Sequence, residues 1–258
     1  MTPAILIDVT RCTGCERCVA ACIKRNELDP LRAETDRATG VDGLSANRWS
    51  TIVQVDRGRF ARKSCMHCEE PSCVSACLVG GLTKTDAGPV VYDDSKCIGC
   101  RYCMLACPFH IPRYEWDETI PYVRKCDMCF ERLQDGQKPA CVEACPNEAL
   151  LFGDRNDLLG VARDRINRDP QYKNHVWGET EFGGTSVLYV SDVDLAGLGW
   201  PEHLDNPISA LTDPLIHMTP VIGMTVAFGS LGLSWIIRRR MTRASEADGE
   251  DGEHDAKS

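Results

Sequence analysis

Short apolar runs alternate with polar turns over the first part of the chain. Residues 3–9, PAILIDV, predict a short strand, and residues 49–60, WSTIVQVDRGRF, predict two strands about a turn at their Arg-Gly pair. A further hairpin is predicted over residues 82–93, LTKTDAGPVVYD. The first half of the segment between Cys22 and Cys65 is polar and is typical of a loop.

A helical pattern follows the last cysteine. Asp154 is placed to cap an amphipathic helix that runs to about Asn167, with an apolar face made of Leu158, Leu159, Ala162 and Ile166. We interpret this helix as packing on the preceding domain. Residues 183–193, GGTSVLYVSDV, then predict a strand, and residues 194–214 predict an extended segment.

Residues 215–237 carry no charged side chain, apart from any proton on His217. As a helix, this segment would be about 34 Å long, which is enough to cross a bilayer. A buried core helix would be shorter and amphipathic. The sequence therefore predicts one transmembrane helix. Its small residues would let a neighbouring helix approach closely, and they are Gly223, Ala227, Gly229, Gly232 and Ser234.

The flanks of this segment differ in charge. No Lys or Arg occurs from Asn174 to Pro214, whereas four arginines follow the segment, at Arg238, Arg239, Arg240 and Arg243. The positive-inside rule then predicts a cytoplasmic C-terminus and a large domain on the outer face of the cell membrane. The beginning of the sequence resembles no export signal, so we expect export in complex with a partner that carries one.

The composition is that of a globular protein with an unusual number of cysteines. Of the 258 residues, 43% are hydrophobic and 26% charged, which argues against a disordered or polytopic membrane protein. The net charge of -9 argues against nucleic acid as a partner. The sixteen cysteines must serve either disulfides or metal ligation, and their spacing decides between the two.

The cysteines fall into four groups of four. The first and third groups follow the C-x2-C-x2-C-x3-C spacing of bacterial 4Fe-4S ferredoxins, and the second and fourth are expanded versions that keep the opening C-x2-C and the closing C-x3-C. In order, the groups are Cys12, Cys15, Cys18 and Cys22; Cys65, Cys68, Cys73 and Cys77; Cys97, Cys100, Cys103 and Cys107; and Cys126, Cys129, Cys141 and Cys145.

This spacing suits 4Fe-4S clusters. Three thiolates on a short loop can bind three irons, and the fourth cysteine binds the other cluster of a two-cluster module. Four groups therefore predict four 4Fe-4S clusters with all sixteen cysteines as iron ligands. No C-x2-C pair is followed by His, which excludes haem attachment, and a zinc ribbon has no use for the third and fourth cysteines. His67 and His110 are then structural, because a histidine ligand would leave a thiol spare.

The whole chain resembles the iron-sulfur beta subunits of membrane-bound respiratory oxidoreductases, particularly those of formate dehydrogenase-N and the HybA-type subunit of hydrogenase. Besides the four cysteine motifs, the resemblance rests on CPFHIPRYEWD, KPACVEACPNEALLFGD, GGTSVLYVSDV and a single C-terminal span. It implies an α+β fold, with two nested bacterial-ferredoxin-like two-cluster modules followed by one transmembrane helix.

The resemblance also implies domain bounds and a pairing of cysteines. The expected parts are a four-cluster domain at 1–153, a packing and linker region at 154–214, the transmembrane helix at 215–237, and a basic flank with an acidic tail at 238–258. The spacing alone leaves a sequential pairing open. The family pairing would join Cys12, Cys15 and Cys18 with Cys145; Cys126, Cys129 and Cys141 with Cys22; Cys65, Cys68 and Cys73 with Cys107; and Cys97, Cys100 and Cys103 with Cys77.

The function that the resemblance implies is electron transfer without catalysis. Electrons would pass between a catalytic subunit, bearing molybdopterin or nickel-iron, and an integral quinone-reacting membrane subunit, either a cytochrome b or a haem-free protein. We expect formate dehydrogenase first. A HybA-type hydrogenase subunit, a subunit of a molybdenum or sulfur-compound reductase, and a stand-alone membrane-tethered ferredoxin remain alternatives. Catalytic motifs such as HExxH, GxSxG and a phosphate loop are absent from the sequence.

Several cations adjoin the cysteine loops. They could stabilise the more negative reduced form of a cluster, or each could be a solvated surface charge. The six are Arg11, Arg17, Lys63, Lys96, Arg101 and Lys125.

Overall fold

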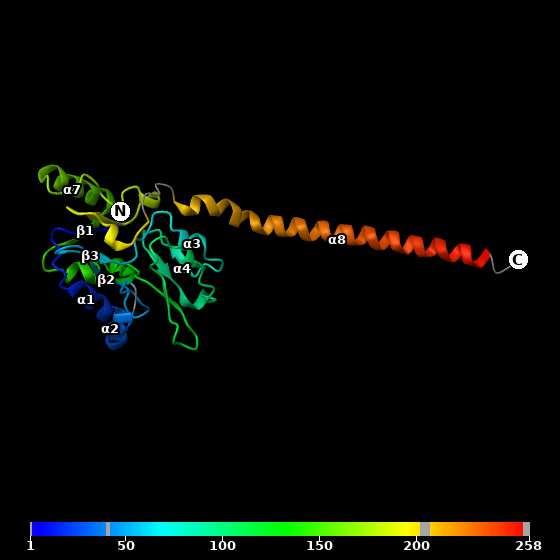
Figure 1. Ribbon diagram of the computed structural model, residues 1–258, viewed down its shortest axis with the longest axis horizontal. Helices are drawn as coiled ribbons and strands as arrows, with labels where there is room; N and C mark the ends of the chain where they lie inside the picture. The colour runs from blue at the N-terminus through cyan, green and yellow to red at the C-terminus, as the bar shows by residue number, and fades with distance from the viewer. Residues whose placement is uncertain (1, 40–41, 202–206, 255–258) are drawn as a thin grey trace. The chain divides into compact units, whose positions relative to one another are not determined.

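The computed structural model describes residues 2–39, 42–201 and 207–254, in two units, Met1–Ala210 and Leu211–Ser258. The first unit mixes short strands and helices, as predicted for an α+β protein (Figure 1). Each unit is described by itself.

A three-stranded sheet with the order β8-β1-β9 lies at the centre of the first unit. The central strand β1 (Pro3–Asp8) is antiparallel to β8 (Leu150–Asp154) and parallel to β9 (Val187–Val190). All six residues of β1 are buried, which explains its apolar run. The sheet therefore ties the beginning of the chain to two segments that lie far along it.

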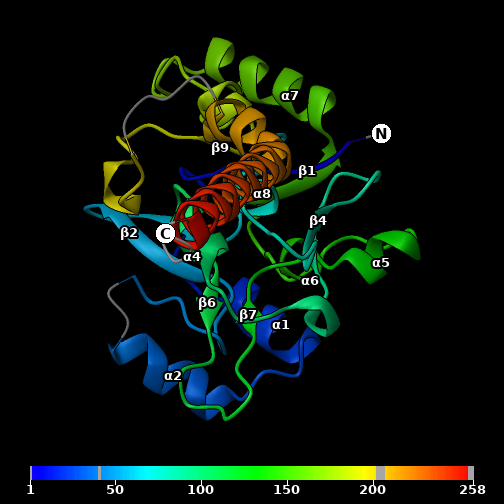
Figure 2. The same cartoon turned by 90° about the vertical axis from the view of Figure 1, so that its right-hand side faces the viewer.

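Alternate residues of β1 face two different cores. Ala4 and Leu6 pack against the apolar face of α7 (Arg155–Arg168), which crosses one side of the sheet (Figure 2). Ile5 and Ile7 contribute to the larger core, which includes many of the cysteines. The predicted helix is confirmed, and the Asp154 carboxylate caps it by accepting the N–H of Asn156 at 3.0 Å.

Three two-stranded hairpins complete the strand content of the described residues. Both predicted hairpins are present and antiparallel, and a third was not predicted. The pairs are β2 (Thr51–Asp56) with β3 (Arg59–Lys63), β4 (Leu82–Lys84) with β5 (Val90–Tyr92), and β6 (Arg113–Tyr114) with β7 (Val123–Arg124).

Short helices accompany the cysteine loops. The α-helices are α1 (Arg17–Arg25), α3 (Ser72–Ser75), α4 (Tyr102–Ala106), α5 (Phe130–Gln134) and α6 (Ala140–Glu143). The 3-10 turns are η1 (Asp94–Lys96), η2 (Glu181–Gly183) and η3 (Ala196–Leu198).

Two predictions of irregular structure are wrong. The expected loop after Cys22 contains α2 (Pro30–Thr39), whose first turn is capped by the Asp29 carboxylate through the N–H groups of Leu31 at 2.9 Å and Arg32 at 3.2 Å. This helix lies on the surface, so its sequence lacks a broad apolar face. The segment expected to be extended through residue 214 is helical from Ile208 onward.

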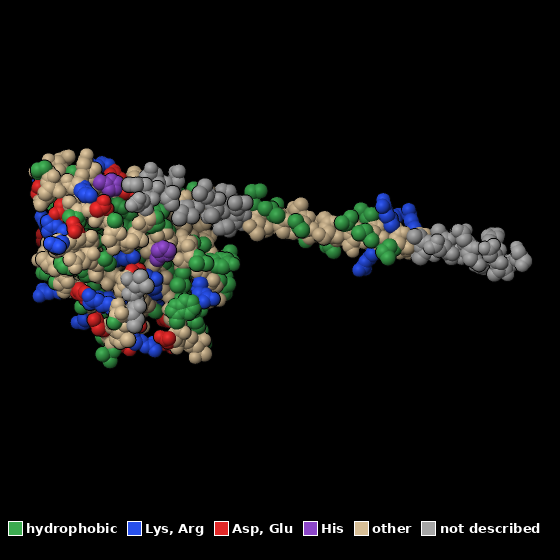
Figure 3. All heavy atoms as spheres, in the orientation of Figure 1, with side chains coloured by type: hydrophobic (Ala, Val, Ile, Leu, Met, Phe, Trp, Pro, Cys, Tyr) green, Lys and Arg blue, Asp and Glu red, His purple; other side chains and the backbone are tan. Residues whose placement is uncertain are grey.

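Helix α8 spans Ile208–His254 and, from Leu211 onward, makes up the described part of the second unit. Within it, Met218–Arg243 is the one described helical stretch that is long and apolar enough to cross a membrane, with a mean hydropathy of 1.7 and no burial of its most apolar part. Figure 3 shows apolar side chains along this helix, followed by a belt of arginines. Residues 255–258 of the expected acidic tail lie outside the described residues.

Candidate iron-sulfur centres

The central sheet brings the first and fourth cysteine groups together. Ile7 at the end of β1 pairs with Leu150 at the start of β8, and the Asp8 N–H donates to the Ala149 carbonyl at 2.8 Å. Cys12 follows β1 and Cys145 precedes β8, so both lie near the same end of this antiparallel strand pair. We call these two cysteine groups and their supporting elements the terminal module.

One cavity in the terminal module is lined by four cysteines. It also contacts apolar side chains from both strands, Ile7 and Leu150. The cysteines are Cys12, Cys15, Cys18 and Cys145, the same four that the family resemblance groups together.

The second and third cysteine groups meet through the hairpin of β4 and β5. Leu82 pairs with Tyr92, and the Asp93 N–H donates to the Gly81 carbonyl at 2.8 Å. Cys77 precedes β4 and Cys97 follows β5, so both lie near the open end of this hairpin. We call these two groups and their supporting elements the central module.

The helices pack in the same two pairs. Helix α1, which carries Cys18 and Cys22, packs against α6, which carries Cys141. Helix α3, which carries Cys73, packs against α4, which carries Cys103. Strand pairing and helix packing thus associate the first group with the fourth and the second with the third.

The thiols of the terminal module have raised pKa values. Burial raises the pKa of Cys18 to about 12 and that of Cys22 to about 11. These values include the effect of negative charge on neighbouring thiolates: Cys141 and Cys145 act on Cys18, and Cys141 and Cys129 act on Cys22. These interactions link cysteines from opposite ends of the module.

The central module behaves similarly. Burial, together with charge on Cys77 and Cys100, raises the pKa of Cys103 to about 11. Burial also raises the pKa of Cys107 to about 11, and Cys65 contributes. Because the thiolate is the metal-binding form, such thiols need compensating positive charge to lose their protons.

The backbone of all four loops bends in the same place. The residue before the second cysteine of each group has a left-handed conformation, with φ of 72° at Gly14, 46° at His67, 71° at Gly99 and 59° at Met128. For a non-glycine residue this conformation costs about 1–2 kcal/mol. Left-handed conformations of non-glycine residues cluster at functional sites.

The bends aim backbone N–H groups at sulfur. Gly99 donates to Cys97 Sγ at 3.4 Å and Met128 donates to Cys126 Sγ at 3.4 Å. Such N–H groups stabilise negative charge on thiolates and tune the potential of a bound cluster.

The donor set fits 4Fe-4S clusters. All sixteen cysteines are free thiols. In the described part of the chain, no three His, Cys, Asp or Glu side chains converge as a single ion would require. A cluster instead takes thiolates spread around a cube of iron and sulfide, with N–H groups directed at sulfur, which suits cysteine-only loops of this shape.

Only two of the six cations singled out from the sequence are buried, namely Lys63 and Lys125. The Lys125 ammonium donates to the carbonyls of Val90 at 2.5 Å and Cys126 at 2.9 Å. The other four are exposed, and they are Arg11, Arg17, Lys96 and Arg101. Sequence reasoning missed Arg62, which is fully buried beside the cysteines.

The two histidines occupy different environments. His67 is buried, and its Nδ1 accepts the N–H of Val90 at 3.0 Å, which links the second cysteine loop to β5. Burial and nearby positive charge hold the pKa of His67 well below its usual value, so the ring is neutral. His110 is exposed.

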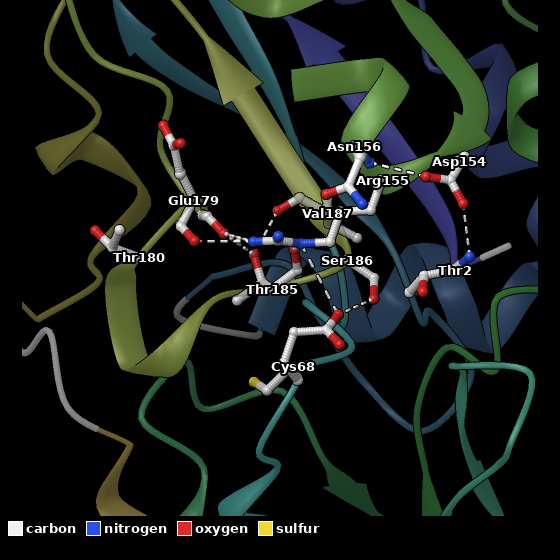
Figure 4. A network of polar contacts seen from close by, with 12 residues as sticks. Thr2, Cys68, Asp154, Arg155, Asn156, Glu179, Thr180, Thr185, Ser186 and Val187 are labelled. Carbon is white, nitrogen blue, oxygen red and sulfur yellow. Dashed lines mark hydrogen bonds and ion pairs between the residues drawn. The ribbon is translucent and has the colours of Figure 1, made fainter. Parts of the chain in front are cut away.

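Arg155 holds the second cysteine loop against the central sheet (Figure 4). Its guanidinium donates to the carbonyls of Thr185 at 2.9 Å and Glu179 at 2.8 Å. The Glu69 carboxylate, next to Cys68, lies 3.9 Å from the same guanidinium and accepts the Ser186 hydroxyl at 2.8 Å. The second cysteine loop is thus tied to the segment that leads into β9.

Comparison with known proteins agrees with this geometry. Residues 57–155 match the family model of a 4Fe-4S dicluster domain. The hydrogenase-2 operon protein HybA of Escherichia coli O157:H7 is 32% identical over 286 residues, covering 96% of this chain and 87% of HybA. The iron-sulfur subunit of the nitrate-inducible formate dehydrogenase of E. coli K12 is 36% identical, covering 72% of this chain and 67% of that subunit.

A protein of Nitratidesulfovibrio vulgaris is 43% identical over 210 residues. The match covers 78% of this chain, and the chain spans only 57% of that relative.

Fold, cysteine loops and family model together define a ferredoxin-like iron-sulfur protein of the electron-transfer class. The chain belongs to the family of iron-sulfur subunits that includes HybA and the formate dehydrogenase iron-sulfur subunits. The resemblance drawn from the sequence is confirmed.

Proposed function

We propose that this chain carries four 4Fe-4S clusters in two nested modules and conducts electrons between a catalytic subunit and a quinone-reacting membrane subunit. A 4Fe-4S cluster held by these cysteines would supply one-electron transfer. The chain's own residues supply ligands, exclude water and direct N–H groups at sulfur. They break no substrate bond.

The proposed ligand sets follow the nested pairing. The observation that carries them is the pair of antiparallel contacts, β1 with β8 and β4 with β5, each of which joins the ends of two cysteine groups. The four sets are Cys12, Cys15, Cys18 and Cys145; Cys22, Cys126, Cys129 and Cys141; Cys65, Cys68, Cys73 and Cys107; and Cys77, Cys97, Cys100 and Cys103.

Side-chain electrostatics support each set. Cys12 interacts with Cys145 and Cys15, and Cys22 interacts with Cys141 and Cys129. In the central module, charge on Cys107, Cys65 and Cys73 raises the pKa of Cys68 beyond the effect of burial, and Cys103 interacts with Cys77, Cys100 and Cys97. A sequential pairing, in which the first group shares its clusters with the second, has no comparable support.

The proposal also names two candidates for the catalytic partner. Formate dehydrogenase is the partner that the sequence favours. A second candidate, a nickel-iron hydrogenase, is favoured by the extent of the similarity to HybA, which covers nearly the whole chain. Either partner would hand electrons to the same set of clusters.

The membrane arrangement also belongs to the proposal. Helix α8 would cross the membrane once, with the arginines at 238–240 and Arg243 on the cytoplasmic side and the cluster domain on the outer face. The uncharged residues 215–237 form about 34 Å of helix before the first arginine, which suffices for a bilayer with some tilt.

A purification from native membranes tests the partner. The chain is extracted with detergent and isolated under conditions that keep complexes intact, and co-purifying proteins and metals are analysed. Molybdenum or tungsten with a molybdopterin subunit supports formate dehydrogenase, and nickel supports hydrogenase. Isolation without any partner would contradict a subunit role and favour a membrane-tethered ferredoxin.

Deletion of the chain from Leu215 onward tests the anchor. The expected result is release of the cluster-bearing domain, with its iron, from the membrane fraction, because the span is then absent. Membrane association of the truncated chain would contradict the proposal that α8 is the main anchor.

A further inference from the structure

Arg62, on strand β3, is a buried cation that forms no ion pair with a carboxylate of the described residues. Its side chain is 2% exposed, and Nη1 donates to the Ser64 hydroxyl at 2.6 Å. Nε has no hydrogen-bond partner among the described residues. Arg48, which is equally buried, is instead neutralised by Glu16 at 3.0 Å. An unpaired buried guanidinium is costly, so its charge requires another source of compensation.

The compensation lies in the terminal module. Arg62 lines the cavity that contains Cys12, Cys15, Cys18 and Cys145. Arg62 also interacts with cysteines of the other terminal set. Burial lowers the pKa of Arg62, but negative charge on Cys141, Cys126 and Cys22 raises it by more, so the pKa is raised overall. One guanidinium therefore lines the cavity of the first proposed set and interacts electrostatically with cysteines of the second.

We propose that Arg62 is the shared counter-charge of the two terminal-module clusters and raises the reduction potential of both. This rests on the proposed function. Each cluster becomes more negative by one charge when it accepts an electron, and a fixed buried cation favours that form. The electron comes from, and leaves to, the neighbouring redox groups of the complex.

Arg62 keeps its proton throughout this step. The guanidinium is permanently charged in proteins, so electron transfer beside it needs no accompanying proton transfer. Its Nε–H, which has no partner among the described residues, is also available to donate to sulfur. A lysine could supply the charge at this position, but not the fork of donors.

The hairpin offers matched variants. Arg62→Gln removes the charge and keeps a polar side chain, and Arg62→Lys keeps the charge. Arg57→Gln removes a charge from the exposed turn of the same hairpin and serves as the control. Each variant is purified in the complete complex, its iron content is measured, and its centres are titrated by EPR against potential.

In Arg62→Gln, the equilibrium constant for reduction of two of the four centres should fall about tenfold, which is about 59 mV for one electron. The other two centres should stay unchanged, as should all four in Arg57→Gln. In Arg62→Lys, both affected potentials should stay nearer to those of the wild type. Four retained clusters with unchanged potentials in Arg62→Gln would overturn the proposal.

If Arg62→Gln loses clusters, its potentials cannot be compared, and the Arg62→Lys variant becomes the test. Retention of both terminal clusters with lysine supports the requirement for charge. Their loss with lysine as well shows a packing role and overturns the proposal. A wild-type complex with fewer than four clusters would instead refute the proposed function, so the two failures are distinguishable.

Discussion

The terminal and central modules share one construction but surround their cysteines differently. In the terminal module, one entire proposed set is buried, namely Cys22, Cys126, Cys129 and Cys141. In the central module, three cysteines of the set Cys77, Cys97, Cys100 and Cys103 are half-buried. These two sets therefore differ in solvent access, a property that adjusts cluster potential.

The charges around the two modules differ as well. Arg62 lines the terminal cavity and pairs with no carboxylate in the part of the chain that the structure describes. The buried cation that acts on the central cysteines Cys73 and Cys107 is Lys125, which donates to two backbone carbonyls. The central module also leaves large apolar side chains exposed, including Leu78 at 63%, Ile98 at 64% and Leu105 at 83%. The modules thus differ in the features that set potential and accessibility.

Serine substitutions within one proposed ligand set should have the largest effect. Cys12→Ser and Cys145→Ser should disturb the same centre, because both residues line one cavity although they are far apart in the sequence. Cys77→Ser and Cys97→Ser should disturb one other centre. The measurement is EPR of each reduced variant.

The proposed ligand sets are contradicted if the two serine variants of one set remove different centres. Each variant should also lose no more than about four irons per chain, the content of one cluster.

Two glycines at equivalent loop positions offer a smaller and sharper test. Both have φ near 70°, so an alanine costs about 1–2 kcal/mol at either position. At Gly14 the new Cβ would also lie 2.9 Å from the Phe60 ring, which adds about 1–3 kcal/mol of overpacking. At Gly99 it would meet only the Tyr114 hydroxyl at 3.0 Å, at the end of its side chain.

Gly14→Ala should therefore destabilise the protein more than Gly99→Ala does. The measurement is thermal loss of the cluster absorbance together with loss of secondary structure. Equal destabilisation would show that the aromatic contact in the terminal module is not restrictive.

Lys96→Gln should have the smallest effect. The Lys96 side chain is 55% exposed and pairs with Asp93 at 2.9 Å, so water and this carboxylate already screen its charge from Cys97. Its removal should shift the potential of the nearest centre by less than a third of the shift expected for Arg62→Gln. A shift as large as that of Arg62→Gln would contradict the distinction between buried and exposed cations.

Much of the fold was predictable because it is local. The hairpin at 49–60 carries alternating residues about a glycine turn, and the helix that begins after Asp154 has both a cap and an apolar face. Helix α2 escaped prediction because it lies on the surface and lacks a broad apolar face. The β6–β7 hairpin has two residues in each strand, which is too short for an alternation of apolar and polar residues to predict it.

The remaining features depend on contacts between distant segments. The pairing of β1 with β8 and β9 joins residues more than one hundred positions apart, which periodicity cannot specify. The burial of Arg62 follows from the position of β3 between the cysteine groups, and the sequence RFARK gives no sign of which basic residue turns inward. Spacing predicts the cysteine ligands, whereas the surroundings of these cysteines required the fold.

Iron and acid-labile sulfide, measured per chain in the purified complex, test the central claim most directly. Sixteen cysteines in four complete sets predict about sixteen irons and sixteen sulfides. A content near eight of each, with eight thiols open to alkylation under native conditions, would contradict a four-cluster electron-transfer subunit.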